Sequence, residues 1–546
     1  MRSLLFASVL ALTAAVPAYG QAPVGSAGFP LAPVTGQRAA CGTDGFARLT
    51  IDGRAVAFPC RGVDLMSYLP LPSVGGACNV GSATCGTVSL ATTWGWTDPE
   101  TRREYALLGR SDGTSFVDVT DPLRPVYVGI LPRPAFRTDA PTMPVLPSQW
   151  RELKVLGNTV AVVSEANGHG MQTFDLRELR RFGGTPITFA ETGRYTGFGR
   201  AHNVLVSEVS GTAIATGLQG TQTPPGCGLG LHIVNIAAPA TPTFDACYNA
   251  PSLFATRGYT HDAQCVRYRG PDTRFTGREI CLLSNEKALI TVDLTNRSAI
   301  RDIGATTYPN AAYTHQAWFT EDQRYAFLND ELDESRGLVP RTRTFVFDLQ
   351  RLDTPILAAS YDGPSTAIDH NEYIRGQYVF QANYTAGVRI LDATTPTAPV
   401  EAAFFDTYPA NDATAFNGIW NVYPYFPSGN IVAGGIAEGL FVLRPTAIAL
   451  DGTDTETPTR GALQVDGPNP TAGRTTLRLA SPLAGPAFVA VYDASGRRVA
   501  VLFDGPVAAE TRTLAFDAAA LAPGVYTVRA SLPGGTTATA RVVVLR

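Results

Sequence analysis

The stretch Thr114–Gly129, TSFVDVTDPLRPVYVG, decides the fold because altered copies of it recur along the chain. Each copy is a short apolar run, most of them ending in an acid or an asparagine, and several continue through a proline-containing turn into a second β-rich run. The other copies read MQTFDLREL, LHIVNIAAPATPTFDA, LITVDLTN, RTFVFDLQRLDTPILAA, GVRILDATTPTAPVEAA and GLFVLRPT. The polar positions are Asp118, Asp175, Asn235, Asp293, Asp348 and Asp392, at steps of 44 to 60 residues. A repeat of this length that holds several strands predicts the blades of a β-propeller.

A second element, a histidine or a tryptophan, precedes each copy at the start of an expected strand. Its seven occurrences are Trp96, Trp150, His202, His261, His315, His370 and Trp420, at steps of 50 to 59 residues. Seven units of about four strands predict a closed seven-bladed propeller. The seventh unit lacks an outer strand of its own, and we expect Cys60–Leu71 to complete it, since this pairing would remove an exposed sheet edge.

Composition along the chain predicts five segments. Residues 1–20 carry an arginine, an apolar core and a small-residue end, the pattern of a signal peptide cut after Gly20. Residues 21–88 form an N-terminal segment with disulfides, and residues 89–445 form the propeller. A polar linker, 446–461, leads to residues 462–546, where short strands broken by Asn-Pro, Ser-Gly and Pro-Gly turns predict a small Ig-like β-sandwich. The expected fold class is therefore all-β, a seven-bladed propeller followed by a sandwich.

Net charge and cysteine content indicate which partners and which cellular compartment the chain can have. The net charge of −4 with no basic block excludes the footprint of a nucleic-acid binder, and no segment of the mature chain has the roughly 20 apolar residues of a membrane helix. The eight cysteines fit an oxidising compartment, and none has the CxxC spacing of a zinc or redox site. The expected disulfides are Cys41–Cys60, Cys78–Cys85, Cys227–Cys247 and Cys265–Cys281. We expect a secreted or cell-surface protein that passes through the periplasm.

The usual strand order of a blade, innermost first, places the second element at one mouth of the central channel. The start of the first strand then lies beside the end of the second, so His315 is expected near Asp330 and Glu331. The ligand-binding candidates at this mouth are His202, His261, His315, His370, Trp150 and Trp420, and His169 is expected nearby. Imidazole with carboxylate suits Zn, Mn or Fe. The candidate ligands of a divalent cation are His261, His315, His370, Glu286, Asp330 and Glu331.

The same residues have an architectural alternative. A residue that recurs in each blade commonly holds neighbouring blades together, and tryptophan replaces histidine at three of the seven positions. The sequence contains no G-x-S-x-G motif and no phosphate-binding glycine loop. Only the histidines and acids at the channel mouth therefore offer chemistry, and no catalytic residue is assigned. A divalent cation is the one cofactor that the pattern indicates.

Five blocks of sequence follow one another in a specific order and at specific spacings within Cys60–Pro445. They are WGWTDPETRREYALLGRSDGTSFVDVTDPLRPVYVG, GHGMQTFDLREL, THDAQCVRYRGPDTRFTGREICLLSNE, THQAWFTEDQRYAFLNDELDE and DHNEYIRGQYVFQANYTAGVRILD. On these blocks the chain resembles the choice-of-anchor B family, bacterial surface proteins built from LVIVD-type repeats. The resemblance implies an extracellular propeller and carries over no catalytic residues, because no molecular activity is established for the family.

The C-terminal segment carries four short motifs in a distinctive order. They are GPNPTAGRTTLRL (Gly467–Leu479), VYDASGRRV (Val491–Val499), LAPGVYTV (Leu521–Val528) and the final ARVVVLR. They resemble the C-terminal sorting domain (type A) of the type IX secretion system, with Gly467 where an aromatic residue usually precedes Pro-Asn-Pro. The resemblance implies that residues 462–546 engage the outer-membrane secretion machinery, with later release or surface attachment.

Two functions follow as hypotheses. The first is an exported binding or interaction module, delivered through its sorting domain, whose partner is an extracellular protein or glycan. The alternative is a metal-dependent hydrolase or lyase that uses the histidine and carboxylate residues at the channel mouth. The first requires the recurring rings to bond the neighbouring blade, and the second requires them to point at one place.

Overall fold

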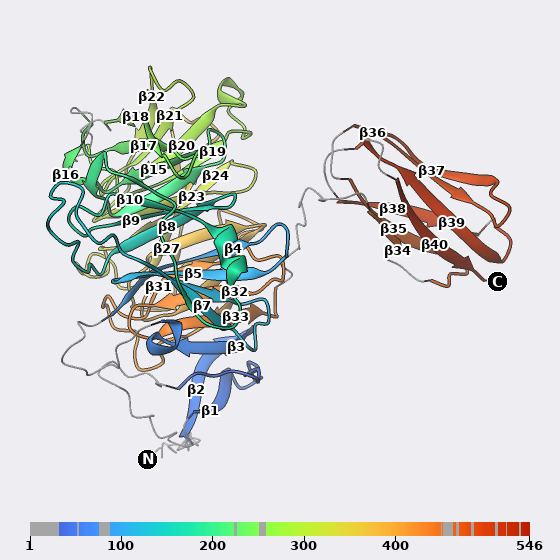
Figure 1. The fold of residues 1–546 in the computed structure, drawn as a ribbon, viewed down its shortest axis with the longest axis horizontal. Coiled ribbons are helices and arrows are strands. Elements are labelled where there is room, and N and C mark those ends of the chain that lie inside the picture. Colours follow the sequence, from blue (N-terminus) through green and yellow to red (C-terminus); the bar gives the residue numbers. More distant parts are fainter. Residues whose placement is uncertain are drawn as a thin grey trace, which may run out of the picture. The chain divides into compact units, whose positions relative to one another are not determined.

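The computed structural model is all-β and divides into two compact units, Met1–Leu450 and Asp451–Arg546 (Figure 1). It describes residues 32–51, 54–75, 88–222, 227–249, 258–448, 450, 462–465, 469–481, 485–507, 511–519, 521–533 and 537–545. The signal-peptide prediction and the Cys78–Cys85 pairing lie outside these residues. Across the described ranges, no helix has both the length and the apolar character needed to span a membrane.

Seven sheets, each built on four antiparallel strands, make up most of the described part of the first unit. The first four are β4 (Leu90–Thr97), β5 (Glu104–Arg110), β6 (Gly113–Asp118), β7 (Val126–Pro132); β8 (Arg151–Leu156), β9 (Thr159–Ser164), β10 (Met171–Asp175), β12 (Gly193–Tyr195); β14 (Asn203–Ser207), β15 (Thr212–Thr216), β17 (Leu231–Asn235), β18 (Thr243–Tyr248); and β19 (Asp262–Arg267), β20 (Glu279–Ser284), β21 (Leu289–Asp293), β22 (Arg301–Thr306). The last three are β23 (Thr314–Phe319), β24 (Tyr325–Asp330), β25 (Arg343–Asp348), β26 (Ile356–Asp362); β27 (Asn371–Arg375), β28 (Tyr378–Ala382), β29 (Val388–Asp392), β30 (Val400–Phe405); and β31 (Ile419–Tyr423), β32 (Ile431–Gly435), β33 (Gly439–Pro445), β3 (Val63–Pro70).

The first strand of each set lies innermost, and these strands close into a ring. Each of β4, β8, β14, β19, β23, β27 and β31 contacts the innermost strand of the next sheet, and β31 contacts β4. This arrangement is a seven-bladed β-propeller, so the predicted fold class is confirmed.

The repeated acid or asparagine has a local physical cause. Each of the six residues ends the third strand of its sheet, and its side chain accepts a hydrogen bond from the backbone N–H two residues later. The pairs are Asp118 with Thr120, Asp175 with Arg177, Asn235 with Ala237, Asp293 with Thr295, Asp348 with Gln350 and Asp392 with Thr394, at 2.7–3.0 Å. A short side chain that accepts in this way starts a turn. The repeated acid or asparagine therefore marks the residue at which each third strand ends.

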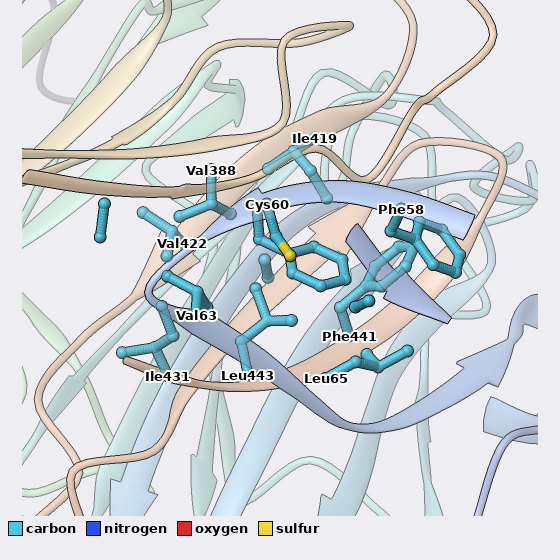
Figure 2. Close-up of a cluster of buried hydrophobic side chains, with 14 of the residues drawn as sticks. Phe58, Cys60, Val63, Leu65, Val388, Ile419, Val422, Ile431, Phe441 and Leu443 are labelled. Carbon is cyan, nitrogen blue, oxygen red and sulfur yellow. The ribbon is translucent and has the colours of Figure 1, made fainter. Parts of the chain in front are cut away.

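The N-terminal strands join the last two blades to each other. The segment expected to complete the seventh sheet does so as β3, which pairs antiparallel with β33. The hairpin of β1 (Phe46–Ile51) and β2 (Arg54–Arg61) extends the sixth sheet through β30. In Figure 2, apolar side chains of β2 and β3 pack with those of β29 and β31–β33. Phe58 belongs to this closure core, with its ring 5.4 Å from that of Phe405 and 6.3 Å from that of Phe441.

Smaller elements and three disulfides complete the part of the first unit that the structure describes. The elements are β11 (Ile187–Thr188), β13 (Phe198–Arg200), β16 (Gln219–Gln222) and the 3-10 helices η1 (Leu71–Val74), η2 (Leu176–Arg181) and η3 (Thr273–Phe275). The disulfides are Cys41–Cys60, Cys227–Cys247 and Cys265–Cys281, as the sequence predicted. Cys265 and Cys281 face each other directly in the register of β19 and β20.

The second unit is a β-sandwich of two antiparallel sheets. One contains β34 (Ala462–Val465), β35 (Arg474–Ala480) and β38 (Thr511–Asp517), and the other β37 (Arg498–Val507), β36 (Gly485–Tyr492), β39 (Gly524–Ser531) and β40 (Thr537–Val544). Buried side chains alternate along β35 and pack with those of the other sheet in one core. Alternation of this kind is typical of strands that have one face on a sandwich core.

We predict that Leu65→Ala in β3 lowers the free energy of unfolding by about 2–5 kcal/mol, because Leu65 is fully buried in the closure core and its loss leaves a cavity. Urea denaturation followed by circular dichroism measures the change. Val126→Ala is the matched control, since Val126 is 44% exposed, and we expect a change within about 0.5 kcal/mol. Equal stability of the two variants would contradict a structural role for the β3–β33 closure.

Candidate metal centre

The histidines of the repeat meet because each stands at the beginning of an innermost strand. His202, His261 and His370 immediately precede β14, β19 and β27, and His315 is the second residue of β23. Neighbouring rings of this set lie 4.3–4.5 Å apart, so the beginnings of these strands share one mouth. We call His202, His261, His315 and His370 the histidine cluster.

Six aromatic side chains form an arc around this mouth. Between neighbours the ring centroids are 4.4 Å apart for Trp150 and Trp420, 4.3 Å for Trp420 and His370, 4.3 Å for His370 and His315, 4.5 Å for His315 and His261, and 4.5 Å for His261 and His202. The space that they line measures about 10 Å³. That is room for about one water molecule. The channel is therefore almost closed at this mouth.

Hydrogen bonds orient each imidazole of the cluster through its Nδ1 atom. The partners are the Trp420 carbonyl for His370 (2.7 Å), Glu165 for His202 (2.7 Å), the Asn329 side-chain oxygen for His315 (3.3 Å) and the Tyr313 hydroxyl for His261 (2.9 Å). Carbonyl, amide and carboxylate oxygens only accept, so Nδ1 donates and Nε2 carries the lone pair. The Tyr313 hydroxyl can accept in the same way. This engagement of one ring nitrogen is typical of metal-ligating histidines.

Glu331, directly after β24, brings a carboxylate to the cluster. Its oxygens lie 3.8 Å from Nε2 of His315 and 3.6 Å from Nε2 of His370, and the Tyr384 hydroxyl donates to it at 2.7 Å. One ligand atom each from His261, His315 and Glu331 lie within 4.8 Å of one another. Ligands bound at about 2.1 Å in a tetrahedral site are separated by roughly 3.4 Å. The donor set and its spacing fit a divalent transition metal.

Burial keeps most of this cluster uncharged. Desolvation, with the neighbouring histidines adding to it, holds the pKa of His261 and of His370 well below the ordinary value, and desolvation lowers the pKa of His315 to about 3. Burial also raises the pKa of Glu331 to about 7. In the described residues, Nε2 of His261 and Nε2 of His370 are buried and make no hydrogen bond. Two neutral nitrogens with lone pairs thus face the closed space without a partner.

His202 behaves differently from the other three. Burial alone would lower its pKa, but the hydrogen bond and the charge of Glu165 outweigh burial and raise the pKa above the ordinary value. Its Nδ1 atom is tied to Glu165, which follows β9 in the neighbouring sheet. His202 thus connects two blades at the edge of the cluster.

Several predicted positions fall elsewhere. Among the described residues, the group of ligand atoms includes none of Glu286, Asp330 and His370, although Nε2 of His370 lies 3.6 Å from Glu331. Asp330 instead accepts from the backbone N–H groups of Ala312 and Tyr313, both at 2.7 Å, and so holds the chain before β23. The backbone of Glu286 pairs with that of Thr314 in an isolated bridge.

Two further positions have other partners. His169 is buried, with Nε2 2.9 Å from Arg151 and Nδ1 bonded to the Gly170 carbonyl. Trp96 lies near the end of β4 rather than at its start, and its Nε1 donates to Gly157 of the next sheet at 3.1 Å. Trp96 thus has the architectural role that the alternative interpretation assigned to the whole repeat.

A polar layer directly beneath the cluster was missed from the sequence. Thr92 donates to Glu152 at 2.7 Å and accepts from Asn421 at 2.8 Å, and Gln316 donates to Asp262 at 2.9 Å. The signal was present, because HN, HD, HQ, HN and WN follow one another at the repeated position. Side chains of this layer link the innermost strands of neighbouring blades and separate the cluster from the rest of the channel.

Asp333, Glu334 and Asp369 form a second group of buried acids. One oxygen of Asp333, one of Asp369 and both of Glu334 have no hydrogen-bond partner among the described residues, while the other oxygen of Asp369 accepts from the Arg343 N–H at 3.0 Å. Desolvation, with the neighbouring carboxylates adding to it, raises the pKa of all three groups. In the folded protein these groups therefore hold protons at a pH where the unfolded chain releases them.

No model of a known protein family matches the chain, and no curated protein matches it. A solved structure with a similar arrangement is the β-propeller domain of Cps50 (Swd1) from Myceliophteria thermophila, with 11% sequence identity, a TM-score of 0.40, and coverage of 65% of this chain and 98% of that chain. A likeness of this degree carries no argument about function. The propeller assignment rests on the seven sheets and the closed ring of innermost strands.

We predict that the free energy of unfolding falls as pH rises from about 4 towards 8, because carboxyls with a raised folded pKa bind protons more tightly in the folded state. Asp333→Asn is expected to flatten this fall by more than about 1 kcal/mol, since it removes one of the repelling charges. Denaturant melts at pH 5 and pH 8 measure the difference. The exposed control Asp121→Asn should leave the slope unchanged, and an unchanged slope in Asp333→Asn would contradict the assignment.

Proposed function

We propose that the chain is an extracellular binding module whose propeller holds a divalent transition-metal ion between His261, His315, His370 and Glu331. The observation that carries this proposal is the common orientation of the imidazoles. Each engages an outer partner through Nδ1, and the Nε2 atoms of His315 and His370 lie within 4 Å of the Glu331 carboxylate. Imidazole and carboxylate ligands suit Zn²⁺, Mn²⁺ or Fe²⁺.

The architectural and the metal interpretations of the repeat are compatible in this geometry. Nδ1 of His370 bonds the Trp420 carbonyl of the next blade, so one nitrogen serves the scaffold and the other is free for a ligand. The four proposed ligands come from the fourth, fifth and sixth blades. A bound ion would therefore link three blades, and it would stabilise the folded state by binding it alone.

A closed site favours a structural or binding ion over a catalytic one. Catalytic zinc sites keep one position open for water or substrate, whereas structural sites are filled by four protein ligands. The space at this mouth is about 10 Å³, which admits no substrate. The metal-dependent hydrolase or lyase is therefore the weaker hypothesis.

We predict that the purified protein contains close to one equivalent of a transition metal, and that chelation lowers the melting temperature. His315→Ala and His370→Ala are expected to lose the metal while keeping the circular dichroism spectrum of the propeller. His232→Gln is the control, because His232 is buried elsewhere, beside Tyr195. Inductively coupled plasma mass spectrometry measures the content. Full metal content in both cluster variants, or none in the wild type, would refute the proposed site.

Export is a second part of the proposal. It is supported by the signal-peptide pattern, by the disulfides that form in the first unit, and by the resemblance of residues 462–546 to a sorting domain. The outer-membrane secretion machinery is the proposed partner of that segment. An extracellular protein or glycan is the proposed partner of the propeller.

We predict that the secreted protein begins at Gln21, because the signal peptide is cut after Gly20. Deletion of residues 462–546 should leave the propeller in the periplasm, folded and with its disulfides formed. N-terminal sequencing and fractionation of a host that carries the type IX machinery measure both outcomes. Equal secretion with and without these residues would argue against a sorting role.

A further inference from the structure

The opposite mouth of the channel opens into a cavity of about 760 Å³. Much of its lining comes from the ends of β4, β8, β14 and β19. The histidine cluster, in contrast, lies at the beginnings of innermost strands. Ligand pockets for small molecules typically measure roughly 300–1,000 Å³. The two mouths share no lining residue, so this cavity is separate from the proposed metal centre.

Five aromatic residues contribute to the walls of this cavity. Three of the five tryptophans of the chain line it, Trp94, Trp96 and Trp318, together with Tyr423 and Tyr425. Trp94 and Trp318 are half-buried. Edge-to-face packing fixes both, with Trp94 5.1 Å from Tyr423 and Trp318 4.9 Å from Tyr373. The cavity thus presents rigid aromatic surface at little cost in side-chain entropy.

Two charged groups of opposite sign stand at the base of the cavity. Lys154 is buried, bonds Glu152 at 2.8 Å and lies 4.5 Å from the Trp94 ring. Asp262 is buried as well and accepts from Gln316. Gln264 also lines the wall, with its side-chain oxygen held by the Phe319 N–H at 2.7 Å. Donors and acceptors therefore alternate with the aromatic faces.

The charges of the lining nearly balance. Arg267, Arg269 and Lys154 are offset by Glu208, Asp262 and the Glu152 partner of Lys154. A balanced lining gives no strong attraction to a phosphate or another polyanion. An apolar peptide anchor would cover Lys154 and Asp262 without offering them hydrogen bonds, which is costly. Lys154 and Asp262 already bond Glu152, Gln316 and Ala263, but an ammonium and a carboxylate each retain capacity for further hydrogen bonds, and a hydroxyl, which both donates and accepts, can use it at either group.

We propose that this mouth binds a neutral oligosaccharide, with the C–H faces of the sugar rings on Trp94 and Trp318 and hydroxyls directed to Lys154, Asp262 and Gln264. A cavity of this size holds roughly two or three sugar rings. The inference deepens the binding-module function and rests on it, but it is independent of the metal centre.

The test begins with the purified full-length protein on a printed array of neutral glycans. The strongest free oligosaccharide is then titrated by calorimetry. Trp318→Ala removes one stacking face and Val206→Trp fills the cavity from its half-buried wall, so each is expected to weaken binding at least about tenfold. Phe136→Ala, 55% exposed and outside the cavity, should bind like the wild type. Circular dichroism melts establish that each variant is folded.

His315→Ala separates this proposal from the metal site, because it is expected to lose metal and retain sugar binding. Absence of binding to the whole array would overturn the proposal. Sugar binding that survives both Trp318→Ala and Val206→Trp would overturn the placement. A displayed peptide library that yields ligands sensitive to both substitutions, with no glycan bound, would assign the cavity to a protein partner instead.

Discussion

The antiparallel pairing of β3 with β33 is the contact on which the rest of the first unit depends. The last sheet meets the first through β31 and β4, and the outermost strand of that sheet comes from before the first blade. The hairpin of β1 and β2 adds to the sixth sheet, and the closure core fills the space between the two. Strands far apart in sequence thus complete the last two sheets, and β3 covers the edge that β33 would otherwise expose.

Closure of the ring gives the recurring histidine position two roles, one in the scaffold and one at the candidate site. The beginnings of the innermost strands converge, so neighbouring rings that are 54 to 59 residues apart in sequence lie 4.3–4.5 Å from one another. Each imidazole can then bond outward through Nδ1 and leave Nε2 to the centre. The two interpretations of the sequence, a scaffold or a site, assumed that each ring has one role. An imidazole has two nitrogens, so it can bond the scaffold through one and a ligand through the other.

The two mouths differ because the innermost strands carry different side chains at their two ends. Rings at one end close the channel to about 10 Å³, and the other end widens to a cavity of about 760 Å³. The polar layer of Thr92, Glu152 and their neighbours separates them. Buried acids near the closed end, such as Glu331, lie in an environment that disfavours their charged form. Such groups lower the stability of the fold at neutral pH unless a proton or a cation compensates them.

Local patterns in the sequence determined the blade count, the stops of the third strands, the Cys265–Cys281 register and the completing strand Cys60–Leu71. These depend on neighbours along the chain or on one strand pairing, which periodicity reports directly. Periodicity could not decide where a residue lies along its strand, so Trp96 was assigned to the wrong end. It could not decide the direction in which a side chain points either, so Asp330 was expected in a site, whereas its oxygens accept from backbone N–H groups. Only the closed ring decided which imidazole atoms meet and where an open cavity remains, because those outcomes depend on the packing of all seven sheets around one axis.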